Sequence, residues 1–280
     1  MEILRYAAFT TVPTGGNPAG VVLDAAGTPV DELLRAAASV GYSETAFLFP
    51  TADPDAFDVR YFSPLAEVPF CGHATIATAV ALAERGSAGL VRLRTAAGPV
   101  EVRTSRDVDG RIVATLLTVP PRSAALADED LDELLAALGW DAGDLDPSLP
   151  PQVAYAGAWH PVIAARTRAR LADLDYDFDR LGRLMAARDW TTVALVHRES
   201  PELFHARNPF PPGGVREDPA TGAAAAALGG YLRELGLVEP PATVTIHQGD
   251  DMGRPGVLTV GIPADRQSGI EVSGTAVLIP

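Results

Sequence analysis

The sequence predicts an α+β protein made of two similar halves, in which many short strands surround one long helix each. Three observations lead to this fold class. The chain has 280 residues, a length that suits two domains. It also carries an internal repeat. In each copy of that repeat, strand-like segments flank an alanine-rich run of good helix formers.

The repeat aligns residues 67–86 with residues 217–236 at an offset of 150 and without a gap. Eight of the twenty aligned pairs are identical, although two of these are alanine pairs that the alanine-rich composition favours. The recurring turn and helix-end residues are harder to attribute to composition: Pro69/Pro219, Gly72/Gly222 and Gly86/Gly236. The repeat therefore predicts two copies of one structural unit.

Each copy predicts the same elements in the same order: two strands, a helix that follows a Pro-x-x-Gly turn and ends at a glycine, and two further strands. The predicted ranges are strands 45–49 and 57–62, helix 74–85 and strands 90–95 and 99–104 in the first copy, and strands 192–196 and 203–207, helix 223–235 and strands 243–247 and 257–262 in the second.

The segment 122–151 separates the two copies and contains a predicted amphipathic helix, 128–138, that Gly139 ends. A last strand-like segment, 274–279, lies beyond the second copy. We expect it to return and complete the first half. The expected domains are therefore 1–119, completed by a strand at about 270–280, and 120–269.

Composition excludes several classes of site. All 22 basic residues are arginine, so a lysine Schiff base, a Walker-type phosphate loop and a Ser-x-x-Lys site are ruled out. A formal net charge of −14 argues against nucleic acid and anionic membranes as partners. No His-x-x-x-His or Cys-x-x-Cys spacing predicts a metal site. With a single cysteine, no basic–apolar leader and no membrane-length apolar stretch, we expect a cytoplasmic protein.

Two equivalent loops, 70–73 and 220–223, lead into the predicted helices. Each offers backbone N–H groups and the positive end of a helix dipole, which suit an anion. Because pseudo-symmetric halves tend to place equivalent loops across a shared cleft, we expect them to hold the carboxylate of a small substrate. Gly72 and Gly222 allow close approach of that ligand, and the alternative is that they only form tight turns.

Acid–base chemistry needs a titratable group near those loops. Glu44 precedes the apolar run 46–49, where burial can raise the pKa of a carboxyl group and suit it to remove and return a proton. An ordinary solvated glutamate is the alternative. Cys71, at a helix start, is a candidate thiolate, although a buried inert thiol is the commoner state.

Two further polar residues differ between the copies. His73 corresponds to Ala223, and this asymmetry favours a chemical over a structural role. Asp218 corresponds to Val68 and is a candidate helix cap that only one half has.

Five motifs, spread in order over essentially the whole chain, resemble the signatures of the PhzF-like phenazine biosynthesis family: GNPAGVV (16–22), SETAF (43–47), CGHAT (71–75), EDPATG (217–222) and QG…MGRP (248–255). That family is similar in fold to diaminopimelate epimerase, with two halves that are each a small strand barrel around a central helix. The resemblance agrees with the internal repeat.

The resemblance implies isomerisation of trans-2,3-dihydro-3-hydroxyanthranilate, or a similar small carboxylated conjugated substrate, without a cofactor or metal. It implies that Glu44 shuttles the proton and that His73 and Asp218 contact the substrate and assist protonation. It also implies a homodimer.

The implied substrate-binding residues are Asn17, Gly72, Gly222 and Ala223, with backbone amides around the two glycines as the carboxylate cradle. The position of Ala223 is often serine in the family, so one hydroxyl donor is absent here while the backbone N–H remains.

Two other functions stay open. A two-base epimerase or racemase would use Cys71 with Asp218 or Glu44, although such chemistry favours two matched groups and a second thiol is absent. A non-catalytic metabolite-binding protein would keep the site without the reaction.

Overall fold

The structure is a computed structural model that describes residues 1–280. The chain divides into two compact units: unit 1 comprises Met1–Leu117 and Ser273–Pro280, and unit 2 comprises Thr118–Val272. The expected boundary at 119 falls two residues after the observed one, and that at 269 falls three residues before it. None of the helices combines the length and the apolar character that a membrane crossing requires.

Unit 1 holds the elements β1 (Leu4–Ala8), β2 (Asn17–Val22), α1 (Val30–Val40), β3 (Thr45–Pro50), β4 (Ala56–Phe62), β5 (Glu67–Val68), α2 (Gly72–Glu84), β6 (Leu90–Thr95), β7 (Gly98–Arg106), β8 (Ile112–Leu117) and most of β17 (Glu271–Leu278). Eight strands pair in a closed ring, in the order β1, β2, β3, β4, β6, β7, β8, β17 and back to β1. The β2–β3 and β4–β6 pairings are parallel, and β5 is added to β4. The ring is a closed barrel.

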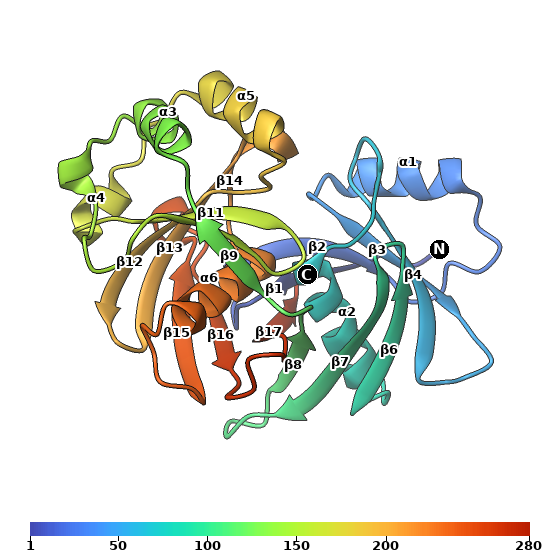
Figure 1. Cartoon of the computed structure of the whole chain (residues 1–280). Coiled ribbons are helices and arrows are strands. Elements are labelled where there is room, and N and C mark those ends of the chain that lie inside the picture. The colour runs from blue at the N-terminus through green and yellow to red at the C-terminus, as the bar shows by residue number, and fades with distance from the viewer. The chain divides into compact units, whose positions relative to one another are not determined.

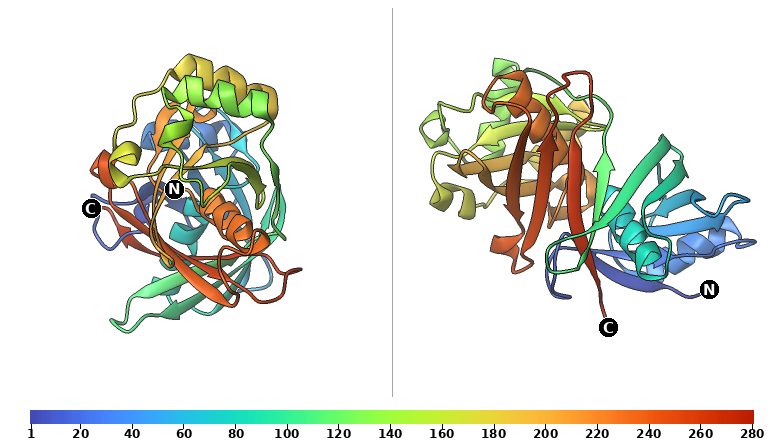
Figure 2. Two further views of the ribbon diagram at one scale, coloured as in Figure 1. Left: turned by 60° about the vertical axis from the view of Figure 1, so that its left-hand side comes forward. Right: turned by 90° about the horizontal axis from the view of Figure 1, so that it is seen from below.

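Helix α2 lies inside this barrel (Figure 1, Figure 2). It contacts β1, β2, β3, β7 and β8, and its residues from His73 to Ala83 are all buried. An eight-stranded barrel has an interior only wide enough for side chains, so a helix fits there only if its own side chains are small. The alanine-rich sequence of α2 meets this requirement, and the helix is apolar on all sides because every side faces a strand.

Unit 2 holds β9 (Arg122–Ala125), α3 (Asp128–Leu138), β10 (Gln152–Tyr155), β11 (Trp159–Ala164), α4 (Arg168–Ala172), α5 (Phe178–Arg188), β12 (Ala194–Ser200), β13 (Leu203–Phe210), β14 (Val215–Asp218), α6 (Gly222–Glu234), β15 (Ala242–Gln248) and β16 (Gly256–Ile262). The strands pair in the order β9, β10, β11, β12, β13, β15 and β16, with β14 added to β13. The parallel pairings are β11–β12 and β13–β15, at the positions equivalent to those of unit 1.

Helix α6 is the buried helix of unit 2 and contacts β9, β10, β11, β12 and β16. Two glycines let it approach its neighbours. A Cβ at Gly229 would lie 2.7 Å from Val260 Cγ1, and one at Gly230 would lie 2.4 Å from Pro121 Cβ. The predicted fold class, two α+β halves with strands around a central helix, is confirmed.

The repeated glutamate near the end of each central helix has a structural role. Glu84 accepts a hydrogen bond from the Tyr6 hydroxyl of β1 at 2.5 Å. Glu234 accepts from the hydroxyl and the backbone N–H of Ser123 on β9, at 2.5 and 2.9 Å. In both units this carboxylate therefore ties the last turn of the central helix to a strand.

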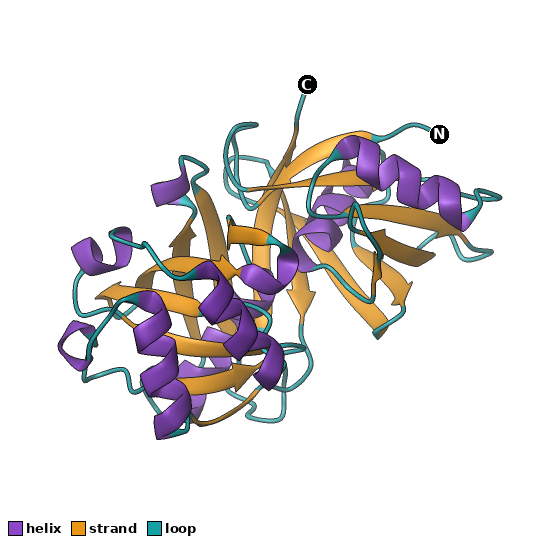
Figure 3. Cartoon of the chain, turned by 90° about the horizontal axis from the view of Figure 1, so that it is seen from above, coloured by secondary structure: helices purple, strands orange, loops and turns teal.

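The outer helices correct one expectation. The prediction of α3 at 128–138, ended by Gly139, is confirmed, but each unit also has a long helix that was not predicted, α1 in unit 1 and α5 in unit 2. Helix α5 packs against α3 on one side of unit 2 (Figure 3). It ends at Asp189, which adopts the left-handed conformation (φ 55°) usually taken by glycine, so its end carries no glycine signal.

Candidate active site

Three titratable side chains of unit 1 meet where β3 and α2 begin. Glu44 directly precedes β3, Cys71 is the N-cap residue of α2, and His73 is the second residue of that helix. Glu44 Oε2 lies 3.5 Å from both His73 Nε2 and Cys71 Sγ, and Cys71 Sγ lies 3.4 Å from His73 Nδ1. A carboxylate, a thiol and an imidazole are therefore in mutual contact.

The backbone around Glu44 explains two glycines of the first motif. Gly20 of β2 donates its N–H to the Glu44 carbonyl at 3.1 Å, and a Cβ at Gly20 would lie 2.5 Å from Thr45 Oγ1. Gly16 has φ 53°, and a Cβ there would lie 2.0 Å from the Ala8 carbonyl oxygen. Both glycines are thus required for β2 to pass close to its neighbours and to the residue that carries the carboxylate.

Burial distinguishes Glu44 from an ordinary glutamate at a strand end. Its side chain is 17% exposed, and that of His73 is 7% exposed. Cys71 is buried as well. The alternative of a fully solvated Glu44 therefore does not hold, because most of its side-chain surface is covered and its carboxylate contacts a ring nitrogen and a thiol.

The imidazole of His73 is held from two sides. Asn17, the first residue of β2, is buried and places its Nδ2 3.2 Å from His73 Nδ1. Ser43 Oγ lies 3.5 Å from His73 Nε2. Asn17 therefore contacts one ring nitrogen, Nδ1, while the other, Nε2, faces Glu44.

Gly72 has no structural reason to be glycine. It is the first residue of α2, its φ is not positive, and a Cβ built on it would meet no atom within 4 Å. The tight-turn alternative therefore does not apply to Gly72. The N–H groups of Gly72, His73 and Ala74 precede the first helical hydrogen bond, from Thr75 N to the Cys71 carbonyl at 3.0 Å, so this open backbone suits an anion.

In unit 2, Asp218 ends β14 and is buried. Its Oδ2 accepts a hydrogen bond from the Thr221 hydroxyl at 2.5 Å. The N-cap residue of α6 is Thr221, so the prediction of Asp218 as a candidate helix cap is wrong. A carboxylate three residues before the cap residue instead fixes the hydroxyl of that residue.

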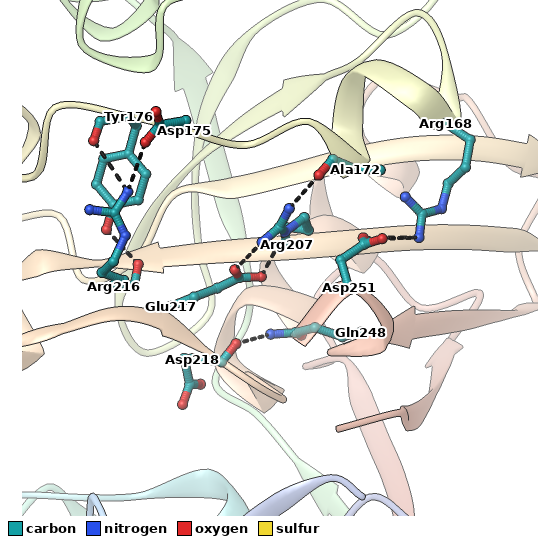
Figure 4. A network of polar contacts seen from close by, with 10 residues as sticks. All are labelled: Arg168, Ala172, Asp175, Tyr176, Arg207, Arg216, Glu217, Asp218, Gln248 and Asp251. Atoms are coloured by element: carbon teal, nitrogen blue, oxygen red, sulfur yellow. Dashed lines mark hydrogen bonds and ion pairs between the residues drawn. The ribbon is translucent and has the colours of Figure 1, made fainter. Parts of the chain in front are cut away.

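Gln248 holds the same loop from the end of β15. Its Nε2 donates to the Asp218 carbonyl at 2.8 Å, as Figure 4 shows, and its Oε1 accepts from Thr221 N at 3.1 Å. The next residue, Gly249, has φ 87°, and a Cβ there would lie 2.8 Å from the Pro219 carbonyl oxygen. The Gln-Gly pair of the fifth motif thus supports the loop 218–221.

Gly222 and Ala223 are the first two residues of α6 and are partly exposed. Their N–H groups precede the first helical bond, from Ala225 N to the Thr221 carbonyl at 3.0 Å. Ala223 therefore keeps the backbone donor that the sequence predicts. The expectation that the two helix starts share a cleft stays a prediction.

An ion pair anchors each loop at the same place in its unit. Arg60 of β4 binds both carboxylate oxygens of Glu67 at 2.7 and 2.5 Å. Arg207 of β13 binds both oxygens of Glu217 at 3.0 and 2.6 Å (Figure 4). The repeated glutamates of the two copies therefore fix the strands that lead into the central helices.

The two units share this framework but not its titratable groups. By strand register and by the repeat, the titratable residues of unit 1 correspond to uncharged residues of unit 2: Glu44 to Thr192, Cys71 to Thr221 and His73 to Ala223. Conversely, Asp218 corresponds to Val68. The cluster of three groups is thus a property of unit 1 alone.

Sequence reasoning missed part of this site. Ser43 was not a candidate. Cys71 was a candidate thiolate with a buried inert thiol as the alternative, and its contacts with both Glu44 and His73 were not predicted. The side chain of Gln248 had no assigned role. The only available signal was their place inside the five motifs, because these contacts join segments distant in sequence.

Comparison with known proteins agrees with this architecture. The model of the family described as phenazine biosynthesis-like protein (PhzC-PhzF) matches residues 6–280. An uncharacterized isomerase of Bacillus subtilis is 32% identical over 285 residues, which cover 99% of this chain and 96% of the relative. Trans-2,3-dihydro-3-hydroxyanthranilate isomerase of Pseudomonas fluorescens is 31% identical over 274 residues, which cover 96% and 94%.

A crystal structure of the Bacillus anthracis phenazine biosynthesis protein of the PhzF family superposes with a TM-score of 0.89 at 26% identity, covering 100% of this chain and 98% of that one. Fold and relatives together define an isomerase with the diaminopimelate epimerase-like architecture. The chain belongs to the phenazine biosynthesis-like (PhzF) family, as the motifs indicated.

Proposed function

We propose that this protein is a cofactor-independent isomerase in which Glu44 moves a proton between two carbons of a small, carboxylated, conjugated substrate. The observation that carries the proposal is the position of Glu44. It is a mostly buried carboxylate in contact with His73, beside a helix start whose first residue, Gly72, leaves open space. A proton acceptor and an anion-binding backbone thus lie together in one unit.

The proposed reaction is a redistribution of one proton. The N–H groups at the start of α2 bind the substrate carboxylate, and the Glu44 carboxylate takes a proton from an adjacent C–H bond. The electron pair of that bond enters the conjugated system, where the positive helix end and a hydrogen bond from His73 stabilise the developing charge. The protonated Glu44 then delivers its proton to another carbon, so no net oxidation occurs.

Asn17 supports this step by orienting His73, since its amide lies against Nδ1. The proposed part of Asp218, Gly222 and Ala223 in substrate binding rests on the family resemblance, and Asp218→Asn tests the first of them. We also propose a homodimer, which light scattering after size-exclusion chromatography tests.

The first compound to test is trans-2,3-dihydro-3-hydroxyanthranilate, which the name of the Pseudomonas fluorescens relative indicates. Proton NMR in deuterated water is expected to show migration of a double bond together with uptake of solvent deuterium. A protein that only binds the compound exchanges no C–H. Absence of both changes, with this compound and close analogues, contradicts the proposed substrate class.

Glu44→Gln tests the residue itself. We expect turnover to fall by at least about 10²-fold, the usual contribution of a general base, with an unchanged melting temperature. Glu32→Gln, on the exposed first turn of α1, is the matched control and is expected to retain turnover. Near-normal turnover in Glu44→Gln excludes this glutamate as the base. Asp218→Asn is measured in the same assay.

The geometry argues against one of the two residue pairs that a two-base enzyme could use, Cys71 with Glu44. Two bases that attack one carbon from opposite faces need that carbon between them, whereas Cys71 Sγ and Glu44 Oε2 are in contact at 3.5 Å. A two-base enzyme would therefore have to combine Cys71 with Asp218. Conversion of Cys71 to alanine tests that pair, because an active Cys71→Ala protein does not use the thiol as a base.

A further inference from the structure

The cluster of unit 1 brings an imidazole, a thiol and a carboxylate within 4.8 Å of one another. We propose that Glu44, Cys71 and His73 form a binding site for a thiophilic divalent cation such as Zn²⁺ or Co²⁺, and that this cation inhibits the enzyme. The binding part of the proposal is independent of the catalytic role of Glu44, whereas the inhibition rests on the proposed function.

The donor atoms lie close enough together to surround one tetrahedral cation after a small movement of the side chains. With Zn–N and Zn–O bonds of about 2.0–2.2 Å and Zn–S bonds of about 2.3 Å, two ligand atoms on neighbouring corners lie about 3.3–3.6 Å apart. Glu44 Oε2 is 3.5 Å from both Cys71 Sγ and His73 Nε2, and Cys71 Sγ is 3.8 Å from His73 Nε2. These lengths are close to the edges of a tetrahedron, but Cys71 Sγ lies nearer to Nδ1, at 3.4 Å, than to Nε2, so the imidazole has to turn until Nε2 faces the cation.

The chemistry of the donors also fits. Thiolate and imidazole favour zinc and cobalt over magnesium and calcium, which prefer oxygen ligands. Three protein ligands leave the fourth corner to water or an added anion. Binding at Nε2 requires the ring proton on Nδ1, and the Asn17 amide accepts that proton once it turns its oxygen toward the ring.

The expected consequence is reversible inhibition. Metal ligands bind in deprotonated form, so the cation displaces the thiol proton and uses the carboxylate as a ligand. A Glu44 carboxylate bound to a cation is no longer available to accept a proton from carbon. The active enzyme is then the metal-free form, and substrate and cation compete for the site.

A second group of potential ligands serves as an internal control. On unit 2, His205 Nε2 bonds Glu199 Oε2 at 2.6 Å, and its ring centroid lies 5.6 Å from that of His247. This group contains no sulfur. Because Cys71 is the only cysteine, a cobalt–thiolate signal can come from the cluster of unit 1 alone.

The test is a Co²⁺ titration of the reduced protein followed by absorption spectroscopy. We expect a near-ultraviolet sulfur-to-cobalt charge-transfer band that saturates at one equivalent and disappears when Zn²⁺ is added. Cys71→Ser is expected to abolish the band, and His73→Gln to weaken cobalt affinity by at least about tenfold. His205→Gln, the matched control, is expected to keep the band. Absence of the band in the unsubstituted protein refutes the site without reference to any variant.

Inhibition is measured separately. Zn²⁺ at the concentration that saturates the site is expected to stop isomerisation, and a chelator to restore it. A cobalt band with full activity in saturating metal refutes the inhibitory role but keeps the site. A cobalt band in a protein that isomerises none of the tested compounds refutes the proposed function instead, so the two failures are distinguishable.

Discussion

The stability of unit 2 is expected to depend on pH through His160. This residue lies on β11 with no exposed surface, its Nδ1 is 2.9 Å from Thr192 Oγ1, and its Nε2 has no hydrogen-bond partner. Burial lowers the pKa of His160 from 6.5 to about 4, and a hydrogen bond with the backbone of Thr192 opposes this only in part. A protonated ring at this position would carry an unpaired buried N–H.

The sign of the effect follows from proton uptake. Above pH 6.5 the histidine is neutral in both the folded and the unfolded chain, so its contribution to stability is fully present. Between pH 6.5 and about 4 the unfolded chain binds a proton that the folded protein does not, so stability falls as the pH falls. Lowering the pH from 7.5 to 5 is expected to remove about 2 kcal/mol through this residue alone.

Urea unfolding at pH 7.5 and 5, followed by tryptophan fluorescence, measures this effect. All three tryptophans, Trp140, Trp159 and Trp190, lie in unit 2, so the signal reports the unit that contains His160. His160→Asn removes the titrating ring and is expected to reduce the pH-dependent loss by about 2 kcal/mol. Thr192→Val, the control, lowers stability but retains the pH dependence. An equal loss of stability between pH 7.5 and 5 in His160→Asn and in the unsubstituted protein excludes His160 as the source of the pH dependence.

Two further pairs of substitutions test the framework. Glu217→Gln leaves the guanidinium of Arg207, whose side chain is 11% exposed, without its charge partner and is expected to lower the free energy of unfolding by about 3–5 kcal/mol. Glu67→Gln breaks the equivalent ion pair of unit 1, whose side chains are 33% and 36% exposed. This loss is expected to be less than about 1 kcal/mol. Calorimetry of both variants measures the two losses of stability, and equal losses contradict the role of burial. Gly229→Ala places a Cβ 2.7 Å from Val260 Cγ1 and is expected to cost about 1–3 kcal/mol. The methyl group introduced by Gly72→Ala meets open space, so the melting temperature of this variant is expected to stay unchanged while its KM rises. An unchanged KM contradicts the approach of the substrate to the backbone at residue 72.

The duplication separates framework from chemistry. Both units keep the ion pair before the central helix and the anchored glutamate at its end. Only unit 1 carries the cluster of Glu44, Cys71 and His73. A framework that folds without titratable groups at these positions leaves them available for function.

Much of the fold was predictable because its signals are local. The central helices follow from alanine-rich runs bounded by glycine, and α3 from its amphipathic pattern and Gly139. Helix α5 was missed because Asp189, not glycine, ends it, and α1 was missed although Gly41, with φ 74°, ends it. The return of the last strand to the first half was expected from the sequence, but its pairing with β1 and β8, which closes the barrel, was not, since the β1–β17 pairing joins opposite ends of the chain.

The sequence by itself determined the repeated unit, the two helix starts and the family. Each of these depends on residue types at short, fixed spacings, which act on the backbone wherever the segment lies. Only the tertiary structure decided that the Glu44 carboxylate is covered and that it meets a thiol and an imidazole 27 and 29 residues further along the chain. That contact depends on the strand register that brings the start of β3 to the start of α2, and register is set by long-range packing.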